Sequence, residues 1–201
     1  MATTQEVDVV VIGGGSTGEN VADYAHRGGL EVLLVETGLV GGECSYYACM
    51  PSKALLRPGQ AVAAARRVDG AAQAVTGMLD PGAVLRRRTT FTHGWDDSSQ
   101  VEWAEGAGLE LVRGRGRITG ERQVTVVLPD GGERVVNARH GVVVATGSEP
   151  ARPPVDGLEA PGTGPPATRP ARARCRAGWS CSVAAWRGRS CPRPTPGWVR
   201  R

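Results

Sequence analysis

The hydrophobic positions near the start of the chain form two short apolar runs, separated by glycines and a polar stretch. The first run covers residues 7–12 and ends in three glycines, and the second covers residues 30–35. Residues 16–26 between them are small or helix-tolerant, and Gly28 and Gly29 mark the end of a predicted helix. A strand, a turn, a helix and a strand within about 30 residues predict a βαβ unit with a parallel, buried sheet.

The pattern changes after this unit. Residues 53–75 are rich in alanine and predict a helix interrupted near Pro58 and Gly59, whereas residues 80–109 fit a helix or a loop equally well. Short β-branched runs then alternate with turn signals such as "PDGG", which predicts a small antiparallel β-meander and a last apolar strand at residues 141–145. The expected fold class is α/β: a Rossmann-like domain with a parallel sheet, the meander, and an irregular C-terminal tail.

Charge and composition divide the chain at about residue 160. Residues 1–159 carry 14 Arg and one Lys against 20 Asp and Glu, a net charge of −5, whereas residues 160–201 carry nine Arg and no acid. The main body therefore offers no basic surface for a polyanion. The tail has seven Pro, three Trp and three Cys but no Leu or Ile, a composition that cannot build an ordinary core. We place the domain at 1–159 and the Arg/Pro-rich tail at 160–201.

The tail is interpreted as out-of-frame translation or as disorder. Residues 177–186, written back in assumed GC-rich codons, read R-L-V-V-L-G-G-G-V in a shifted frame, which is a strand followed by a glycine loop. We expect a frame shift near residues 160–165, which leaves Cys175, Cys181 and Cys191 without a function. The rival interpretation is a genuine basic tail that binds nucleic acid through Arg and Trp.

The N-terminus and the apolar runs bear on localisation. No run of about 18 apolar residues occurs, so no membrane span or membrane partner is expected. The first apolar run lacks a preceding basic segment and is interpreted as a strand and not as a signal peptide. The expected compartment is the cytoplasm, where a close cysteine pair is more often catalytic, redox-active or metal-binding than structural.

Gly13, Gly15 and Gly18 match G-x-G-x-x-G directly after a predicted strand and at the start of a predicted helix. Glycines here allow a tight turn, the approach of a pyrophosphate, and close packing of helix and strand. Glu36 ends the second predicted strand, where its carboxylate can accept hydrogen bonds from a ribose. This context predicts dinucleotide binding, although the motif does not distinguish FAD from NAD. The alternative is a glycine turn that serves packing alone.

Cys44 and Cys49 form a close pair whose spacing does not suit a regular helix. A five-residue helical step places the Cα atoms about 8–9 Å apart, and a disulfide needs less than about 7 Å. If the cysteines pair, the segment must be distorted or must join a loop to a helix start. Because no second Cys pair or His cluster lies nearby in the sequence, a metal site is not expected. Two free structural thiols are the other alternative.

The segment "GGECSYYACMPSK" at residues 41–53 resembles the "GGTCxNxGCxPSK" motif of the flavoprotein (pyridine nucleotide-) disulfide oxidoreductases. That family includes dihydrolipoamide dehydrogenase, mercuric reductase and glutathione reductase. Its members also open with a strand, a GxGxxG loop and a ribose-binding acid, and they carry an "ATG" stretch, matched here by Ala145, Thr146 and Gly147. The resemblance spans about residues 7–150. It implies that the loop binds FAD, with Gly42, Thr146 and Gly147 among the cofactor contacts.

The same resemblance implies roles for three side chains. Cys49 would be the charge-transfer thiol beside the flavin, Cys44 the interchange thiol that meets the substrate, and Lys53 a cofactor and catalytic contact near the flavin N5. Lys53 is the single lysine beside 23 arginines. A compact ammonium fits against a flavin edge where a guanidinium would not, and the alternative is a chance surface lysine. Glu43 stands where the family has an FAD-contacting threonine, so we expect it to face solvent or to pair with an arginine.

The resemblance implies an FAD-dependent disulfide oxidoreductase. Hydride would pass from NAD(P)H to FAD, and electrons would continue to the Cys44–Cys49 pair and then to a small-molecule or disulfide acceptor. Family members are homodimers more than twice this length, with nicotinamide-binding and interface domains and a catalytic His–Glu pair that we do not find here. We expect a flavin domain truncated before those parts, with little or no turnover. The alternative is a non-catalytic flavin-binding remnant.

Overall fold

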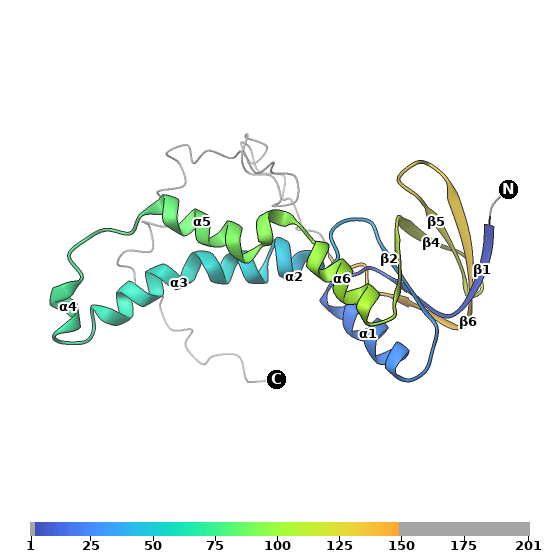
Figure 1. Cartoon of the computed structure of the whole chain (residues 1–201), viewed down its shortest axis with the longest axis horizontal. Coiled ribbons are helices and arrows are strands. Elements are labelled where there is room, and N and C mark those ends of the chain that lie inside the picture. The colour runs from blue at the N-terminus through green and yellow to red at the C-terminus, as the bar shows by residue number, and fades with distance from the viewer. Residues whose placement is uncertain (1–2, 149–201) are drawn as a thin grey trace, which may run out of the picture. The chain divides into compact units, whose positions relative to one another are not determined.

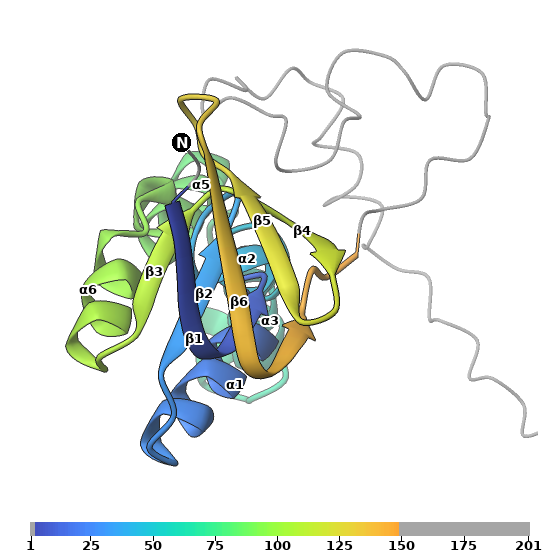
Figure 2. The ribbon, with the colours of Figure 1, turned by 90° about the vertical axis from the view of Figure 1, so that its right-hand side faces the viewer.

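The central element of the structure is a mixed six-stranded sheet in the order β3-β2-β1-β6-β5-β4 (Figures 1 and 2). The structure is a computed structural model that describes residues 3–148. Its strands are β1 (Thr3–Ile12), β2 (Val32–Glu36), β3 (Glu110–Arg113), β4 (Arg115–Gly120), β5 (Gln123–Val127) and β6 (Glu133–Val144). β1 is parallel to β2 and β6, and β2 is parallel to β3. β5 is antiparallel to β4 and β6. The α/β fold class is confirmed.

The predicted βαβ unit is present at the N-terminus. Helix α1 (Ser16–Arg27) connects β1 to β2, and the two strands pair in parallel from Val9 opposite Val32 onward. The helix ends at Arg27 and is capped by Gly28, and the next residue, Gly29, has a φ of +89° that a residue with a side chain rarely adopts. Glu36 is the last residue of β2, as the sequence predicts.

The core lies on both faces of the sheet because successive strand residues point to opposite sides. One face carries Val10 and Leu33, packed with β5 and β6 residues such as Val124. The other face carries Val11 and Leu34, and it is covered by α1 and by α6 (Ser98–Gly106) through the buried Ala22 and Ala104. Burial on both faces explains why the first strands consist of continuous apolar runs and not of alternating ones.

The boundary predicted for the last strand is wrong. Residues 141–145 do not form a separate strand after a meander, because β6 runs without interruption from residue 133 to residue 144. Its first half pairs with β5, and both halves pair with β1 across an irregularity between Val7 and Val9. Arg139 and His140, which resemble a loop in the sequence, lie exposed in the middle of the strand. The meander and the parallel strands are therefore one sheet.

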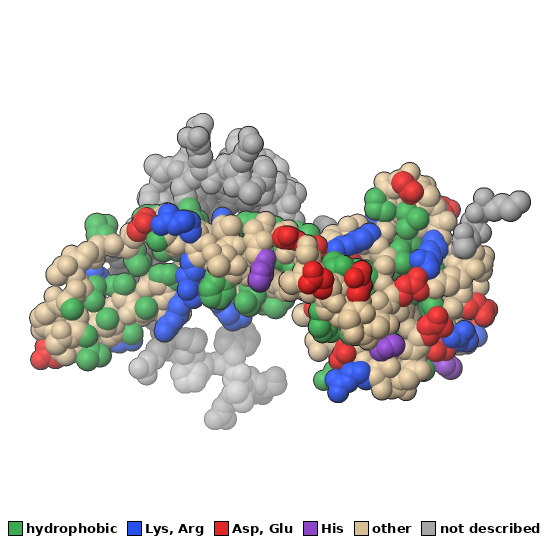
Figure 3. All heavy atoms as spheres, in the orientation of Figure 1, with side chains coloured by type: hydrophobic (Ala, Val, Ile, Leu, Met, Phe, Trp, Pro, Cys, Tyr) green, Lys and Arg blue, Asp and Glu red, His purple; other side chains and the backbone are tan. Residues whose placement is uncertain are grey.

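The helices after β2 are α2 (Gly42–Tyr46), α3 (Cys49–Ala65), α4 (Ala71–Ala74), α5 (Pro81–Phe91) and the 3-10 turn η1 (His93–Trp95). The predicted interruption near Pro58 and Gly59 is wrong, since α3 continues through both residues. α3 packs against α5. Hydrophobic side chains remain visible along these helices (Figure 3), and Leu56 is 60% exposed. The polar stretch at residues 80–109 is mainly helical.

The β1 irregularity is held by an ion-pair cluster that makes stability depend on pH. Asp8 accepts from Arg139 Nε at 2.7 Å and from the Glu31 amide at 2.8 Å, and the Arg139 hydrogen bond is the main reason that its pKa falls to about 2. Because its pKa is depressed in the folded chain, the Asp8 carboxylate stabilises the fold at pH values above the ordinary carboxyl pKa near 4. This contribution is lost as the pH falls toward 2. We expect Asp8→Asn to lower the urea midpoint at pH 6, and the difference from the unsubstituted chain to shrink between pH 4 and pH 2. A difference of constant size across this range would contradict the assignment.

The described part of the chain leaves some predictions without a test. The frame-shift and tail predictions, and the boundary at residue 159, lie outside residues 3–148. Within the described residues, no helix has the length and apolarity needed to cross a bilayer.

Candidate functional site

The glycine loop between β1 and α1 is packed so tightly that side chains are excluded from it. Gly13 has a φ of +107°, and a Cβ built on it would lie 2.3 Å from the carbonyl oxygen of Ala145. A Cβ on Gly18 would lie 1.8 Å from the Gly13 carbonyl oxygen. No described side chain caps the start of α1. The backbone amides of its first turn are therefore available to an anion.

A second glycine pair brings α2 against this loop. The Gly41 amide donates to the Gly14 carbonyl oxygen at 2.7 Å, and Gly41 also forms a parallel bridge with Gly15. Gly42 has a φ of +55°, and a Cβ on it would lie 2.8 Å from the Gly15 Cα. The two glycine segments thus form one continuous backbone surface, and the cysteine segment begins where that surface ends.

Glu36 stabilises the glycine loop through hydrogen bonds, a role that the sequence did not predict beside ribose binding. Its two carboxylate oxygens accept hydrogen bonds from the amides of Gly14 and Gly38, each at 2.6 Å. A carboxylate can accept about four hydrogen bonds, so a ribose hydroxyl could still donate to it. Glu19 lies near Glu36, and burial, with a smaller effect of Glu36, raises its pKa. The raised pKa shifts Glu19 toward its neutral form relative to an exposed glutamate.

The "ATG" stretch follows β6 and lies beside the glycine loop. The Ala145 amide donates to the Ile12 carbonyl oxygen at 2.8 Å, which continues the pairing of β6 with β1. Thr146 and Gly147 come next and are exposed, and Gly147 has a φ of +71°. Residues predicted separately from three distant motifs therefore meet at the carboxyl ends of β1, β2 and β6. In open α/β sheets, this edge is where ligands bind.

The two cysteines lie on either side of a helix break. Cys44 belongs to α2, and Cys49 begins α3. Ala48 between them has φ −122° and ψ −81°, which is not a helical conformation. Both thiols are partly buried, and neither forms a disulfide within the described residues. The break is the local distortion that the sequence predicted as the condition for pairing.

The thiols interact with each other and with Lys53. A hydrogen bond with Cys49 is the largest cause that raises the pKa of the Cys44 thiol, followed by burial, whereas the Lys53 charge acts to lower it. Lys53 lies on α3 one helical turn after Cys49 and is exposed. Glu43 is also exposed, in agreement with its expected orientation toward solvent. The predicted catalytic residues thus lie together where α2 ends and α3 begins.

Removal of the Lys53 charge should make the Cys44 thiolate harder to form. In Lys53→Met, we expect the pH midpoint for alkylation of Cys44 by iodoacetamide to rise above that of the unsubstituted chain, because a neighbouring cation stabilises the thiolate. The alkylated peptide is quantified by mass spectrometry. Arg57→Met, which removes an exposed cation one turn further along α3, is the matched control and should leave the midpoint unchanged. A lower midpoint in Lys53→Met would contradict the assignment.

The cysteine segment is supported by residues of α6 and of the turn before it, which sequence patterns did not identify. Trp95 Nε1 donates to the Tyr46 carbonyl oxygen at 3.1 Å, and Tyr46 Oη donates to Gln100 Oε1 at 2.7 Å. Asp97 accepts from the Val40 amide at 2.7 Å. In the sequence these residues belong to a polar stretch without hydrophobic periodicity. Contacts between residues about 50 positions apart leave no local pattern.

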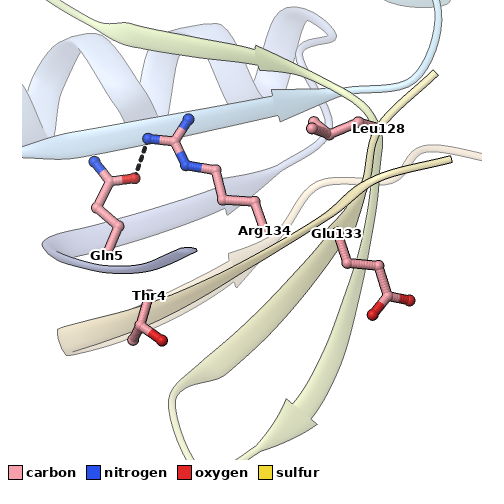
Figure 4. A pocket seen from close by; sticks show the side chains of 5 residues that line it. All are labelled: Thr4, Gln5, Leu128, Glu133 and Arg134. Carbon is pink, nitrogen blue, oxygen red and sulfur yellow. Dashed lines mark hydrogen bonds between the residues drawn. The ribbon is translucent and has the colours of Figure 1, made fainter. Parts of the chain in front are cut away.

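A separate hollow of about 540 Å³ lies at the other end of β1 from the glycine loop (Figure 4). Gln5 and Arg134 are hydrogen-bonded there. Arg134 also pairs with Glu110 of β3. Its charge is thereby already matched within the sheet, and the hollow contributes nothing to the site described above.

Comparisons with known proteins agree with this geometry. The sequence profile for pyridine nucleotide-disulphide oxidoreductases matches residues 7–172. The mercuric reductase of Streptomyces lividans is 34% identical over 155 residues, which are 76% of this chain and 32% of that protein. Dihydrolipoyl dehydrogenase 3 of Pseudomonas aeruginosa is 36% identical over 157 residues, with coverages of 73% and 32%.

The fold also matches a solved structure. The Cu(II) complex of the flavoprotein disulfide reductase RclA from Escherichia coli gives a TM-score of 0.62 at 19% identity, covering 78% of this chain and 32% of RclA. The chain thus spans about a third of the length of these relatives. The sequence profile covers most of the chain, and we conclude that the chain belongs to the pyridine nucleotide-disulphide oxidoreductase family.

Proposed function

We propose that residues 7–148 form the flavin-binding and redox-active part of an FAD-dependent disulfide oxidoreductase. The observation that carries the proposal is the position of Cys44 and Cys49. They flank a helix break directly after Gly41 and Gly42, which contact the glycine loop. In this role the Cys44–Cys49 disulfide takes up two electrons and two protons and becomes two thiols. The reduced pair then transfers these equivalents to an acceptor.

The residues present suit an FAD molecule. Gly13, Gly15 and Gly42 keep the backbone bare where a pyrophosphate would approach, and the first turn of α1 offers free amides. Glu36 retains capacity for a ribose hydroxyl, and Thr146 and Gly147 are exposed beside the loop. When bound, FAD would supply the two-electron link between NAD(P)H and the disulfide. Lys53 would contribute a positive charge that favours thiolate over thiol.

The proposal also covers the electron donor, the acceptor and the oligomeric state of the whole enzyme. The relatives are reductases and dehydrogenases about three times as long as the matched segment. We therefore propose NAD(P)H as the electron donor of the whole enzyme, a small-molecule or disulfide acceptor, a homodimer, and a cytoplasmic location. For the 201-residue chain alone, we expect flavin binding with little or no NAD(P)H-dependent turnover. This expectation rests on the share of the relatives' length that the chain spans, about a third.

The test separates binding from turnover. The 201-residue chain is incubated with FAD, passed through gel filtration, and assayed for bound flavin and for NADH or NADPH oxidation with a disulfide acceptor. About one flavin per chain without turnover is the expected result. Turnover at rates near one per second or above would overturn the inactive-chain proposal, and a folded chain that retains no flavin would overturn the binding proposal. If flavin is bound but Cys44→Ser has no effect on thiol–disulfide exchange, the chain is a non-catalytic flavin-binding protein.

A further inference from the structure

We propose that Tyr46 and Trp95 are positioning residues that keep the helix broken between the two cysteines, and thereby favour the disulfide over the dithiol. The proposal rests on the proposed function, because it concerns the same cysteine pair. It assigns a task to the segment at residues 92–100, here called the anchor segment, which belongs to none of the motifs read from the sequence.

The Tyr46 side chain fixes the end of α2 to the anchor segment. The residue is 1% exposed, and its hydroxyl donates to Gln100 Oε1 at 2.7 Å and lies 3.3 Å from the Asp96 carbonyl oxygen. Burial is the main cause that raises the pKa of Tyr46 to about 12, so the hydroxyl keeps its proton and remains a donor at any physiological pH. A buried tyrosine with a satisfied hydroxyl holds both its ring and its backbone in place.

The Trp95 side chain holds the carbonyl group at which the helix breaks. In an unbroken helix, the Tyr46 carbonyl oxygen would accept from the amide of Met50, four residues further on. Here it accepts from Trp95 Nε1 at 3.1 Å. The amides of Tyr47 and Ala48 both donate to the Glu43 carbonyl oxygen, at 2.9 and 2.6 Å, which closes α2. The indole thus takes the place of the hydrogen bond that would join α2 to α3.

The backbone of the anchor segment is strained where it presents the indole. His93 and Trp95 have φ values of +48° and +64°, which residues with a side chain rarely adopt. Such conformations persist where surrounding contacts enforce them. Asp97 supplies one such contact, since it accepts from the Val40 amide at 2.7 Å and forms an ion pair with Arg113. The anchor segment is therefore attached to both ends of the stretch that carries Cys44.

The break has a direct effect on the cysteine pair. In one continuous helix, the Cα atoms of Cys44 and Cys49 would lie about 8–9 Å apart, beyond the limit of about 7 Å for a disulfide. Without the disulfide the segment can shift toward a continuous helix, even though Pro51 has no amide hydrogen for the Tyr47 carbonyl oxygen, whereas the disulfide prevents this shift. Contacts that stabilise the break therefore stabilise the disulfide relative to the dithiol, and their loss should shift the equilibrium toward the dithiol.

The test is a redox titration of the full chain with Cys175, Cys181 and Cys191 replaced by serine. The pair is equilibrated with glutathione, so that glutathione disulfide takes two electrons and two protons from the thiols, one protein S–S bond forms, and two glutathione molecules are released. The oxidised fraction is read from the Cys44–Cys49 peptide by mass spectrometry. We expect Tyr46→Phe and Trp95→Phe each to lower the equilibrium constant for oxidation roughly three- to tenfold, the size of one lost hydrogen bond.

Two substitutions remove the same chemical groups elsewhere. Tyr47→Phe deletes a neighbouring hydroxyl without a hydrogen-bond partner among residues 3–148, and Trp103→Phe deletes an indole on α6 that is 41% exposed. Both should leave the equilibrium constant unchanged. Equal constants for Tyr46→Phe, Trp95→Phe and the unsubstituted chain would overturn the proposal, as would a shift toward the disulfide.

A second readout does not depend on disulfide formation. Amide hydrogen exchange at Met50 should slow at least about threefold in reduced Trp95→Phe, because the Tyr46 carbonyl oxygen released from the indole becomes its acceptor. If the unsubstituted chain never forms the Cys44–Cys49 disulfide, the proposed function fails while this exchange still decides the role of the anchor residues. Unchanged exchange in Trp95→Phe would overturn that role even where the disulfide forms.

Discussion

Gly18→Ala is expected to destabilise the chain by about 3 kcal/mol or more, the range of severe packing conflicts. The added Cβ would lie 1.8 Å from the Gly13 carbonyl oxygen and 2.9 Å from its carbonyl carbon. These are backbone atoms of the turn between β1 and α1, so no side-chain rotation can relieve the overlap. The helix would have to move away from the first strand and from the core that Val11 forms beneath it. Urea unfolding followed by circular dichroism measures the loss.

The matched control is Gly59→Ala. Gly59 lies inside α3 at ordinary helical angles, and a Cβ there would meet nothing within 4 Å. Alanine should raise the free energy of unfolding by about 0.5–1 kcal/mol, because it reduces the freedom of the unfolded chain and favours helix. If both substitutions have equal effects on the urea midpoint, the close approach at Gly18 is not the reason for its glycine.

Gly42→Val is expected to weaken FAD binding about tenfold to a hundredfold. A Cβ at this position would lie 2.8 Å from the Gly15 Cα, and the φ of +55° is unfavourable for a β-branched residue. The two glycine segments must separate by a fraction of an ångström, which moves the backbone donors that a pyrophosphate needs. An overpacking cost of about 1–3 kcal/mol corresponds to this loss of affinity. Titration of flavin fluorescence measures the dissociation constant.

Gly70→Val separates backbone strain from the local clash. Gly70 has a φ of +84° and open space around it, and it precedes α4, outside the glycine loop. The substitution should cost stability through strain while the FAD dissociation constant stays within a factor of about two. Equal losses of FAD affinity in Gly42→Val and Gly70→Val would show that general destabilisation, and not the close contact of Gly42 with Gly15, governs binding.

Local patterns predicted the parts of the fold that depend on nearby residues. The continuous apolar runs indicated buried parallel strands, and the glycines at 13, 15 and 18 indicated the turn into α1. The path of β6 was not predictable in this way, because Arg139 and His140 resemble a loop until Asp8 and Glu31 are placed beside Arg139. Pro58 also misled the prediction, since α3 continues through it.

In the candidate site, too, local motifs predicted some features and missed those that depend on distant residues. The motifs placed Cys44, Cys49 and Lys53 on one short segment, and the structure brings that segment against the glycine loop. The spacing of the cysteines made a distorted segment the condition for their pairing, but it did not indicate what maintains the break. Trp95 and Gln100 hold the break from about 50 residues away, and their contacts arise from tertiary packing that no local window of sequence contains.

The most direct measurement is the mass of the Cys44–Cys49 peptide from the folded chain, with the tail cysteines replaced by serine, after mild oxidation and again after reduction. A redox-active pair predicts an internally linked peptide that has lost two hydrogen atoms and regains them on reduction, with the circular dichroism of the fold unchanged. Two thiols that stay free under oxidising conditions in a folded chain would contradict the account.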